Sequence, residues 1–350
     1  PECFEIEKRL KAEMNIPAMH DDQHGTAIIS GAALINACEL QGKDISKVKI
    51  VVNGAGAAAI SCTGMYISVG ATKENIVMLD SKGVIRSDRD NLDPSKAEWA
   101  TDRDISTLAD AVKDADVFIG LSAADVLTAE MLNTMAKDPI VLAMANPNPE
   151  IAYELAVDTR KDIIMGTGRS DYPNQVNNVL GFPYIFRGAL DVRSTTINEE
   201  MKIAAVHAIA KLAKEPVPEV VTQAYNNHSL KFSKEYIIPK PNDPRLLPEV
   251  SAAVAKAAIE TGVAKNIITD FEEYKLSLIK RIGKESTIMR NLTQTAKSNP
   301  KRVVFAEGDR FEILRAAQIV KEEKTAMPLI LRKKNKIQQM IKDYALDLED

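Results

Sequence analysis

Two adjacent carboxylates near the start of the chain, Asp21 and Asp22, could bind a metal ion. A hard divalent cation such as Mg²⁺ or Mn²⁺ prefers oxygen ligands, which carboxylates supply. The alternative is structural, because acidic residues at the start of a helix interact favourably with its dipole, and the spacing alone favours this interpretation. His20 and His24 flank the pair at a spacing that matches no zinc site, so we expect both to make local hydrogen bonds.

Asparagine side chains follow two apolar runs further along the chain. Asn146 lies between Ala145 and Pro147, and Asn177 and Asn178 end a polar loop that begins at Gly168. An amide both donates and accepts hydrogen bonds, so these side chains suit a small hydroxy acid. Asx turns, which are ordinary in proline-rich loops, are the alternative.

A β-branched run over residues 48–53 leads into Gly54-Ala55-Gly56-Ala57-Ala58-Ala59 and then into an apolar, helix-compatible segment. Strand, glycine-rich turn and helix in this order match the opening of a dinucleotide-binding unit, although such turns also occur without a ligand. Gly54 permits a sharp turn, Gly56 lets a pyrophosphate approach the backbone, and Ala59 lets the helix pack closely on the strand. The free N–H groups at the helix start would then face the phosphates.

Asp80 closes the next apolar run, at roughly the distance past the glycines where a ribose-binding acid is expected. An acid there favours a free 2′-hydroxyl group, and hence NAD. Lys82 and Arg86 follow closely and could instead hold a 2′-phosphate, and hence NADP. A solvated turn explains these two cations about equally well.

Strands and helices must alternate to bring these residues together. The apolar patterns predict strands over residues 48–53, 76–80, 117–120, 140–145 and 163–166, with helix-compatible segments at 60–69, 105–113 and 128–137. This alternation predicts a doubly wound, Rossmann-type α/β fold, with a parallel sheet covered on both faces. Ligands of such sheets bind beyond the carboxyl ends of the strands. Gly54, Asp80, Gly120 and Asn146 all fall at such ends, which makes them candidates.

The remaining segments predict a helical extension and a second α/β region. Helices are expected over residues 3–14, 27–39 with Thr26 as the cap, 199–212, 247–261 and 271–280. After Pro300, a strand over 302–306 and a helix over 311–322 predict the start of another α/β domain that the chain does not complete.

Composition excludes several classes of protein. The net charge of -4 gives no reason to expect a nucleic-acid or membrane partner, and no apolar run is long enough to span a bilayer. The first residues lack the pattern of a signal peptide. Cys3, Cys38 and Cys62 have no paired spacing, which fits a reducing compartment without disulfides or a zinc site. We therefore predict a cytoplasmic protein.

Taken together, these motifs resemble malic enzyme. The motifs that carry the resemblance lie at residues 16–27, 52–59, 145–150 and 166–178, and the match runs from Pro1 to about Lys265. The tail from about Lys284 looks like the start of a phosphate acetyltransferase domain. This pairing is similar to the bacterial hybrid malic enzymes, which are usually NADP-dependent and use the second domain for regulation.

The resemblance implies roles for the metal-site and substrate-site residues. Asp22 would be a ligand of Mg²⁺ or Mn²⁺, and Asp21 would be its second-shell or catalytic neighbour. Asn146 and Asn178 would contact malate and the nicotinamide side of the cofactor, with Asn177 adjacent. Asp21 and Asn178 would be the catalytic residues on this chain.

The resemblance also implies a set of residues for NADP, or possibly NAD. The backbone and side chains that would hold the cofactor or line its path belong to Gly54, Gly56, Ala57, Asp80, Gly120, Ser122 and Asn146.

The same resemblance predicts a fragment. The catalytic tyrosine and lysine of the family lie in an N-terminal domain that this chain lacks, and an adjacent Glu-Asp pair of metal ligands would fall just upstream of Pro1. We expect residues 1–26 to end the substrate domain with the metal-site loop, 27–283 to form the NAD(P)-binding domain, and 284–350 to start the acetyltransferase-like domain. The complete enzyme would convert L-malate to pyruvate and CO₂ while reducing NADP. This chain alone would bind dinucleotide but turn malate over poorly.

Two alternatives remain from other classes. One is an acetyl-CoA-linked acyltransferase, argued from the tail, and the other is a dinucleotide-binding module without activity. For the malic enzyme, the expected partners are malate, an acetyl-CoA effector acting through the C-terminal domain, and further copies of the chain in a homo-oligomer, with neither nucleic acid nor membrane.

Overall fold

The computed structural model describes residues 2–225, 230–322, 324–344 and 348. The chain divides into two compact units, Pro1–Leu276 and Ser277–Asp350. The three domain ranges expected from the sequence stay a prediction.

The first unit is built on one six-stranded sheet. Its strands are β1 (Ile50–Asn53), β2 (Ile76–Asp80), β3 (Gly83–Val84), β4 (Val117–Gly120), β5 (Ile140–Ala143) and β6 (Ile164–Thr167). They lie in the order β3-β2-β1-β4-β5-β6, and every neighbouring pair is parallel except β2 and β3. The predicted doubly wound parallel sheet is confirmed.

Helices surround the sheet and extend the chain beyond it. They are α1 (Glu2–Glu13), α2 (Asp21–Leu40), α3 (Ala57–Ser68), α4 (Pro94–Ala97), α5 (Leu108–Val112), α6 (Ala129–Thr134), α7 (Tyr153–Thr159), α8 (Phe182–Asp191), α9 (Glu199–Lys214), α10 (Glu219–Ala224), α11 (Leu246–Glu260) and α12 (Phe271–Ser298), with 3₁₀ turns at Lys73–Asn75 and Asn178–Leu180. Among the residues that the structure describes, none of the helices combines the length and apolar character needed to cross a membrane.

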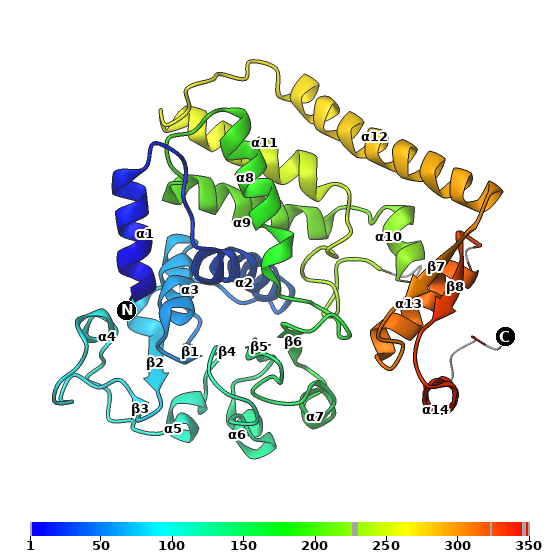
Figure 1. The fold of residues 1–350 in the computed structure, drawn as a ribbon. Helices are drawn as coiled ribbons and strands as arrows, with labels where there is room; N and C mark the ends of the chain where they lie inside the picture. Colours follow the sequence, from blue (N-terminus) through cyan, green and yellow to red (C-terminus); the bar gives the residue numbers. More distant parts are fainter. Residues whose placement is uncertain (1, 226–229, 323, 345–347, 349–350) are drawn as a thin grey trace. The chain divides into compact units, whose positions relative to one another are not determined.

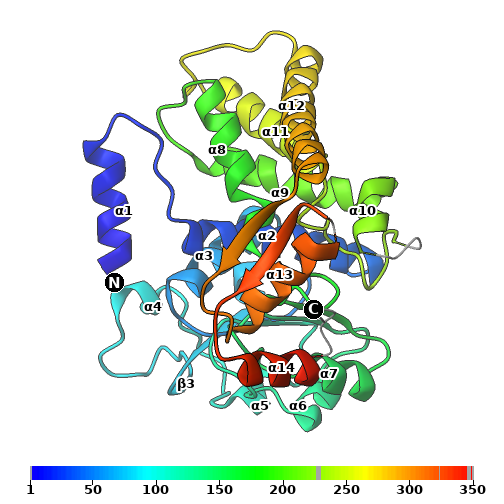
Figure 2. The same ribbon diagram turned by 45° about the vertical axis from the view of Figure 1, so that its right-hand side comes forward.

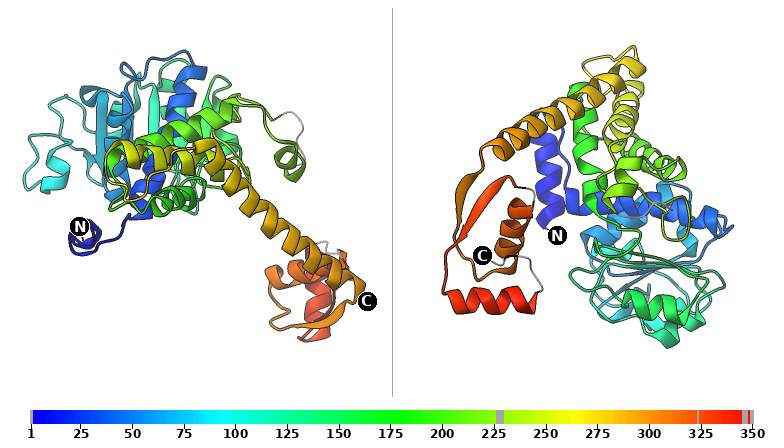
Figure 3. Two further views of the ribbon diagram at one scale, coloured as in Figure 1. Left: turned by 90° about the horizontal axis from the view of Figure 1, so that it is seen from above. Right: turned by 90° about the vertical axis from the view of Figure 1, so that its right-hand side faces the viewer.

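Each parallel strand contributes to two cores, because successive side chains of a strand point to opposite faces. In β1, Ile50 and Val52 join the larger core, whereas Val51 joins the smaller one. In β4, Phe118 likewise joins the smaller core, whereas the residues on either side of it join the larger one. The larger core packs beneath α2, α3, α8, α9 and α11, and the smaller one beneath α5, α6 and α7 (Figure 1; Figure 3). Burial on both faces explains why the strands read as continuous apolar runs.

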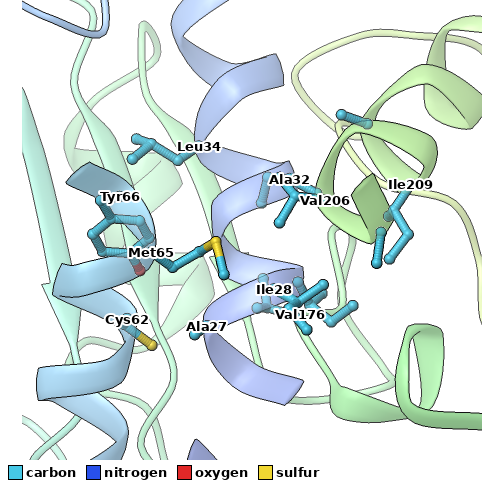
Figure 4. Packing of buried hydrophobic residues seen from close by; sticks show 14 of the residues in the cluster. Ala27, Ile28, Ala32, Leu34, Cys62, Met65, Tyr66, Val176, Val206 and Ile209 are labelled. Carbon is cyan, nitrogen blue, oxygen red and sulfur yellow. The ribbon is translucent and has the colours of Figure 1, made fainter. Parts of the chain in front are cut away.

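Helix α2 is the central helix of the larger core. Figure 4 shows Ala27, Ile28 and Ala32 of α2 among side chains of α3 and α9, such as Met65 and Val206. These residues are almost fully buried. The first turn of α2 carries Asp21 and Asp22, so the packing of this helix fixes the position of the acidic pair.

The start of α2 differs from the prediction. The helix begins at Asp21 rather than Ala27, with His20 at its N-cap, so Thr26 lies inside the helix and does not cap it. The hydroxyl group of Thr26 instead donates a hydrogen bond to Asn178 Oδ1. Two acidic residues in the first turn favour the earlier start because they face the positive end of the helix dipole.

The second unit contains a two-stranded parallel sheet, β7 (Lys301–Phe305) and β8 (Ala326–Ile330). Two helices accompany it, α13 (Phe311–Glu322) and α14 (Lys334–Asp343), and Figure 2 shows the strands side by side next to α13. The predicted strand and helix after Pro300 are confirmed as β7 and α13, whereas β8 and α14 had not been predicted.

Candidate functional site

The carboxyl ends of β1 and β4 form the topological switch point of the sheet. The two strands are neighbours, with Asn53 opposite Gly120, but the chain leaves β1 toward β2 and leaves β4 toward β5. Helical crossovers therefore diverge here, and a crevice between such crossovers is where doubly wound sheets bind ligands.

The turn from β1 to α3 lies at this switch point. Gly54 has a φ of 129°, a backbone conformation that side chains rarely tolerate, and a Cβ atom there would overlap the carbonyl oxygen of Leu121. At Gly56 a Cβ atom would meet open space. Gly56 is also the N-cap of α3 and makes no side-chain cap bond. The first amides of α3 are thus available to an anion.

A partly buried hydrogen-bond network joins the strand ends beside this turn. The side-chain amide of Asn53 donates to Ser122 Oγ over 2.8 Å, and the backbone N–H of Ser122 donates to Glu150 Oε1 over 2.9 Å. The backbone N–H of Ala145 donates to Glu150 Oε2 over 3.1 Å. Burial raises the pKa of the Glu150 carboxyl group, although these hydrogen bonds partly offset that effect. A Cβ atom at Gly120 would overlap the carboxyl group of Glu150.

Asp80, at the end of β2, is held by two cations. Arg89 Nη1 lies 2.9 Å from Asp80 Oδ1, and Lys96 Nζ lies 3.0 Å from Oδ2. Burial alone would raise the pKa of Asp80, but the hydrogen bonds from the Lys82 amide, Lys96 and Arg89 outweigh it and lower the pKa to about 2. The carboxylate is thus fully ionised at neutral pH and is paired with more positive than negative charge.

The cations next to Asp80 differ from those considered in the sequence. Arg86 pairs with Asp88 and Asp104, and the side chain of Lys82 is exposed. Arg89 and Lys96 come from the excursion between β3 and α5. Sequence reasoning missed them because neither lies at a strand end or in a motif.

The acidic pair contacts the asparagine loop through Asp21. The side-chain amide of Asn178 donates to Asp21 Oδ2 over 3.0 Å, while Asp21 Oδ1 is buried without a hydrogen-bond partner among the described residues. Burial and the nearby charge of Asp22 raise the pKa of Asp21, and the bond from Asn178 opposes them. Asp22, in contrast, is exposed.

Glu7 anchors the segment that leads into the acidic pair. Its carboxylate accepts from the backbone N–H of His20 over 3.2 Å and lies 3.0 Å from His24 Nε2. Burial would raise the pKa of Glu7, but the bonds from His24 and Lys11 lower it to about 2. Lys202, which is 8% exposed, approaches the other ring nitrogen of His24 at 3.4 Å. His24 thus makes hydrogen bonds as predicted, but to side chains of other helices, whereas His20 Nδ1 is buried without a hydrogen-bond partner among the described residues.

The remaining asparagines occupy loops next to the strand ends. Asn177 accepts a hydrogen bond from the backbone N–H of Val179 and so caps the short 3₁₀ turn that contains Asn178. Asn146 follows β5, precedes a cis peptide bond to Pro147, and is exposed. The structure therefore joins Asn178 directly to Asp21, whereas no hydrogen bond among the described residues joins Asn146 to either of them.

The donor set fits part of a site for a hard cation. Asp21 and Asp22 supply carboxylate oxygens, and one of these oxygens is buried and unpaired, which is the chemistry that Mg²⁺ and Mn²⁺ prefer. Within the described part of the chain, no group of three or more His, Cys, Asp or Glu side chains is placed to hold a metal ion. Asp22, with Asp21 beside it, would thus supply only part of the ligand set.

Fold and site together define a doubly wound protein of the dinucleotide-binding class. The family model described as malic enzyme, NAD binding domain, matches residues 23–223, and the model for phosphate acetyl/butaryl transferase matches residues 287–350. The chain therefore belongs to the malic enzyme family. Its first unit contains the NAD-binding domain of that family.

Similar proteins are named as malic enzymes that depend either on NADP or on NAD. An NADP-dependent malic enzyme of Haemophilus influenzae is 51% identical over 99% of this chain and 46% of its own length. An NAD-dependent malic enzyme of Rhizobium meliloti is 49% identical over 99% of this chain and 45% of its own length. The crystal structure of Entamoeba histolytica malic enzyme has a TM-score of 0.74 and 34% identity, covering 85% of this chain and 60% of that one. The chain spans about half the length of the curated relatives it matches.

Proposed function

We propose that the protein containing this chain is an NADP-dependent malic enzyme, which moves a hydride from C2 of L-malate to the nicotinamide of NADP⁺ and releases CO₂ to leave pyruvate. The observation that carries this proposal is the glycine turn at the switch point between β1 and β4, in a chain that belongs to the malic enzyme family. The contribution of this chain is to bind and orient the dinucleotide and to supply part of the substrate wall.

The amides of α3 are proposed to bind the pyrophosphate of the cofactor. Gly54 brings the backbone close to Leu121, and the open space at Gly56 gives the phosphates access to the first turn of α3. Ala57 begins that turn. Its N–H group and those that follow carry partial positive charge, which favours an anion. Gly120 and Ser122 would then line the path toward the nicotinamide.

Electrostatics at the end of β2 support NADP over NAD. An aspartate at this position binds the 2′-hydroxyl group of NAD in many dinucleotide sites, but here Asp80 is already engaged by Arg89 and Lys96. Two cations and one carboxylate leave one net positive charge. A 2′-phosphate is therefore expected to be attracted, with Arg89 and Lys96 as its partners.

Asp21, Asp22 and Asn178 are proposed to face malate and a divalent cation. Mg²⁺ or Mn²⁺, when bound, supplies Lewis-acid polarisation of the substrate oxygens. Asp22 is exposed and free to act as a ligand. Asp21 is suited to hold or pass a proton because burial raises its pKa, and Asn178 orients it through their hydrogen bond. Asn146 and Asn177 are proposed to contact malate or the nicotinamide from the neighbouring loops.

The second unit is proposed to respond to acetyl-CoA, and the whole protein to assemble as a homo-oligomer. Support for the effector comes from the match of residues 287–350 to the phosphate acetyl/butaryl transferase family.

Titration of the chain with NADPH, followed by the fluorescence of the reduced nicotinamide, tests the proposal. We expect saturable binding that is tighter than NADH binding, and enhancement of binding by malate together with Mn²⁺, because coupled ligands raise each other's affinity. A chain that binds neither dinucleotide at millimolar concentration would contradict the proposal.

A further inference from the structure

Glu150 is an ionisable side chain with no solvent exposure at the dinucleotide edge of the sheet. It lies in the loop between β5 and α7. The backbone N–H of Leu127, from the loop after β4, donates a hydrogen bond to its carbonyl oxygen over 2.9 Å. A buried carboxyl group is costly unless hydrogen bonds compensate for the lost water. Its place in the fold therefore calls for an explanation beyond core packing.

The two carboxyl oxygens of Glu150 bind different loops. Oε1 accepts from the backbone N–H of Ser122, at 2.9 Å, and Oε2 accepts from the backbone N–H of Ala145, at 3.1 Å. Ser122 Oγ also lies 3.4 Å from Oε1 and accepts from the Asn53 side chain. One carboxyl group thus joins the residues that follow β4 and β5, and Ser122 extends the connection to the end of β1.

Sterics fix the carboxyl group at this place. A Cβ atom at Gly120 would overlap the carboxyl carbon and both oxygens of Glu150, so the group lies directly on the last residue of β4. Neither loop can shift without breaking one of the two bonds. An amide in place of this carboxylate would turn an N–H donor toward one of the two backbone N–H groups.

The loops that Glu150 joins both belong to one half of the doubly wound sheet. Strands β1 and β2 belong to one mononucleotide half, and β4 and β5 belong to the other. The glycine turn and Asp80 lie in the first half, which takes the adenosine side. The loops that Glu150 joins lie in the second half, next to Asn146.

We propose that Glu150 is a positioning residue for the nicotinamide half of the cofactor, which it serves by fixing the loops that begin at Leu121 and Met144. This inference rests on the proposed function, because it requires that the switch point bind NADP. Burial raises the pKa of Glu150, in keeping with a carboxyl group whose hydrogen bonds within the described part of the chain come from two backbone N–H groups and a serine hydroxyl group.

Two ligands separate this role from a general loss of structure. NADP⁺ spans both halves of the site, whereas 2′,5′-ADP fills the adenosine half alone. In the full 350-residue chain, Glu150→Gln keeps the shape of the side chain but turns its amide toward one N–H donor. We expect NADP⁺ binding, measured by calorimetry, to weaken about tenfold, and 2′,5′-ADP binding to stay within about twofold.

A matched control and a second variant complete the experiment. Glu130→Gln makes the same chemical change at an exposed position of α6 and is expected to leave both affinities unchanged. Glu150→Asp keeps both carboxylate oxygens but withdraws them by one methylene group from the backbone N–H groups of Ser122 and Ala145, and it is expected to weaken NADP⁺ selectively by about threefold. This variant decides the matter if Glu150→Gln does not fold, as judged by its melting curve.

Three outcomes are distinguishable. A selective loss of NADP⁺ affinity supports the positioning role. Unchanged affinities, or equal losses for both ligands, would overturn the role of Glu150 and leave the proposed function intact. A wild-type chain that binds neither ligand would overturn both.

Discussion

The charge environment of Asp80 depends on side chains that are distant from the β2 strand end in the sequence. Its place at the end of β2 could be predicted from the sequence, because the distance from the glycine turn is set by one crossover. Its partners could not be predicted. Arg89 lies in the loop before α4 and Lys96 in the short helix α4, and neither segment is long enough for periodicity to show which side chain turns back toward the sheet. The net charge around Asp80 therefore follows from the three-dimensional fold and not from a sequence pattern.

Removing one of these cations should change the cofactor preference. For Lys96→Ala we expect NADPH affinity to fall about tenfold, the size of one charge-assisted hydrogen bond, and NADH affinity to change by less than about twofold. Fluorescence titration of both cofactors measures the ratio. Lys113→Ala, which removes an exposed lysine just after α5, is the control. Equal losses for NADPH and NADH would argue against a 2′-phosphate contact.

The same carboxylate makes stability depend on pH. The pKa of Asp80 is lowered from 3.8 to about 2 in the folded chain, so its stabilisation is fully present above 3.8 and is lost as pH falls through about 2. The shift corresponds to about 2 kcal/mol. Urea unfolding at about pH 6 should show Asp80→Asn destabilised by about this amount, and the gap from wild type should shrink at about pH 2.5.

A control variant makes this comparison interpretable. Asp102→Asn removes an exposed carboxylate from the same excursion, and its difference from wild type should be small at both pH values. A gap for Asp80→Asn that stays constant between the two pH values would show that the ion pairs with Arg89 and Lys96 do not act through ionisation of Asp80.

The acidic pair shows a second limit at the residue scale. Two adjacent aspartates before an apolar helix could be identified as candidates, but not which of them faces the asparagine loop. The structure gives that contact to Asp21, because the first turn of α2 directs adjacent side chains to different sides. No role was assigned to Glu150 from the sequence. A glutamate that follows a proline-rich stretch is typical of a solvated turn, and the sequence pattern does not show that this one is buried.

At the scale of elements, apolar patterns located the five parallel strands of the sheet but not the short antiparallel strand β3. Buried parallel strands read as continuous β-branched runs, and five of them were located to within a few residues. Helix ends were less predictable. α2 starts at Asp21 because a dipole contact outweighed the cap expected at Thr26, and the amphipathic α8, which opens Phe182-Pro183, was missed because the proline resembles loop chemistry.

The turn between β1 and α3 predicts different effects for its two glycines. Gly54→Ala should destabilise the fold by about 1–3 kcal/mol, because its φ of 129° is strained for alanine and a Cβ atom would overlap Leu121. Gly56→Ala meets open space, so the melting temperature should change little while NADPH binding weakens at least about tenfold, since the methyl group occupies the approach to the pyrophosphate.

Thermal melts and NADPH titrations of both variants measure these effects. Gly64→Ala, a helical glycine in α3 whose Cβ atom would also meet open space, is the matched control and should retain binding. Full NADPH affinity in Gly56→Ala would contradict the placement of the pyrophosphate.

At the scale of the whole molecule, the candidate cofactor site lies entirely within the unit Pro1–Leu276. The two compact units agree with two family matches that do not overlap in sequence. Composition had only indicated room for more than one domain. The boundary depends on how contacts are distributed in space, which is why the predicted limits at residues 26 and 283 remain to be tested.

A shortened chain tests this division. Residues 1–283 retain the contacts of α12 with the first unit, among them the ion pair of Lys275 with Glu249. We expect this segment to bind NADPH within about twofold of the full chain, because all of the candidate binding residues lie between Pro1 and Leu276. A loss greater than about tenfold would show that the second unit completes the dinucleotide site.

The most direct test of the central claim is a crystal structure of this chain with NADP⁺. The pyrophosphate should accept hydrogen bonds from the backbone N–H groups at the start of α3, near Ala57, with the 2′-phosphate next to Arg89 and Lys96 and the nicotinamide toward Ser122 and Asn146. A dinucleotide bound elsewhere, or a nucleotide whose phosphates avoid the first turn of α3, would contradict the account.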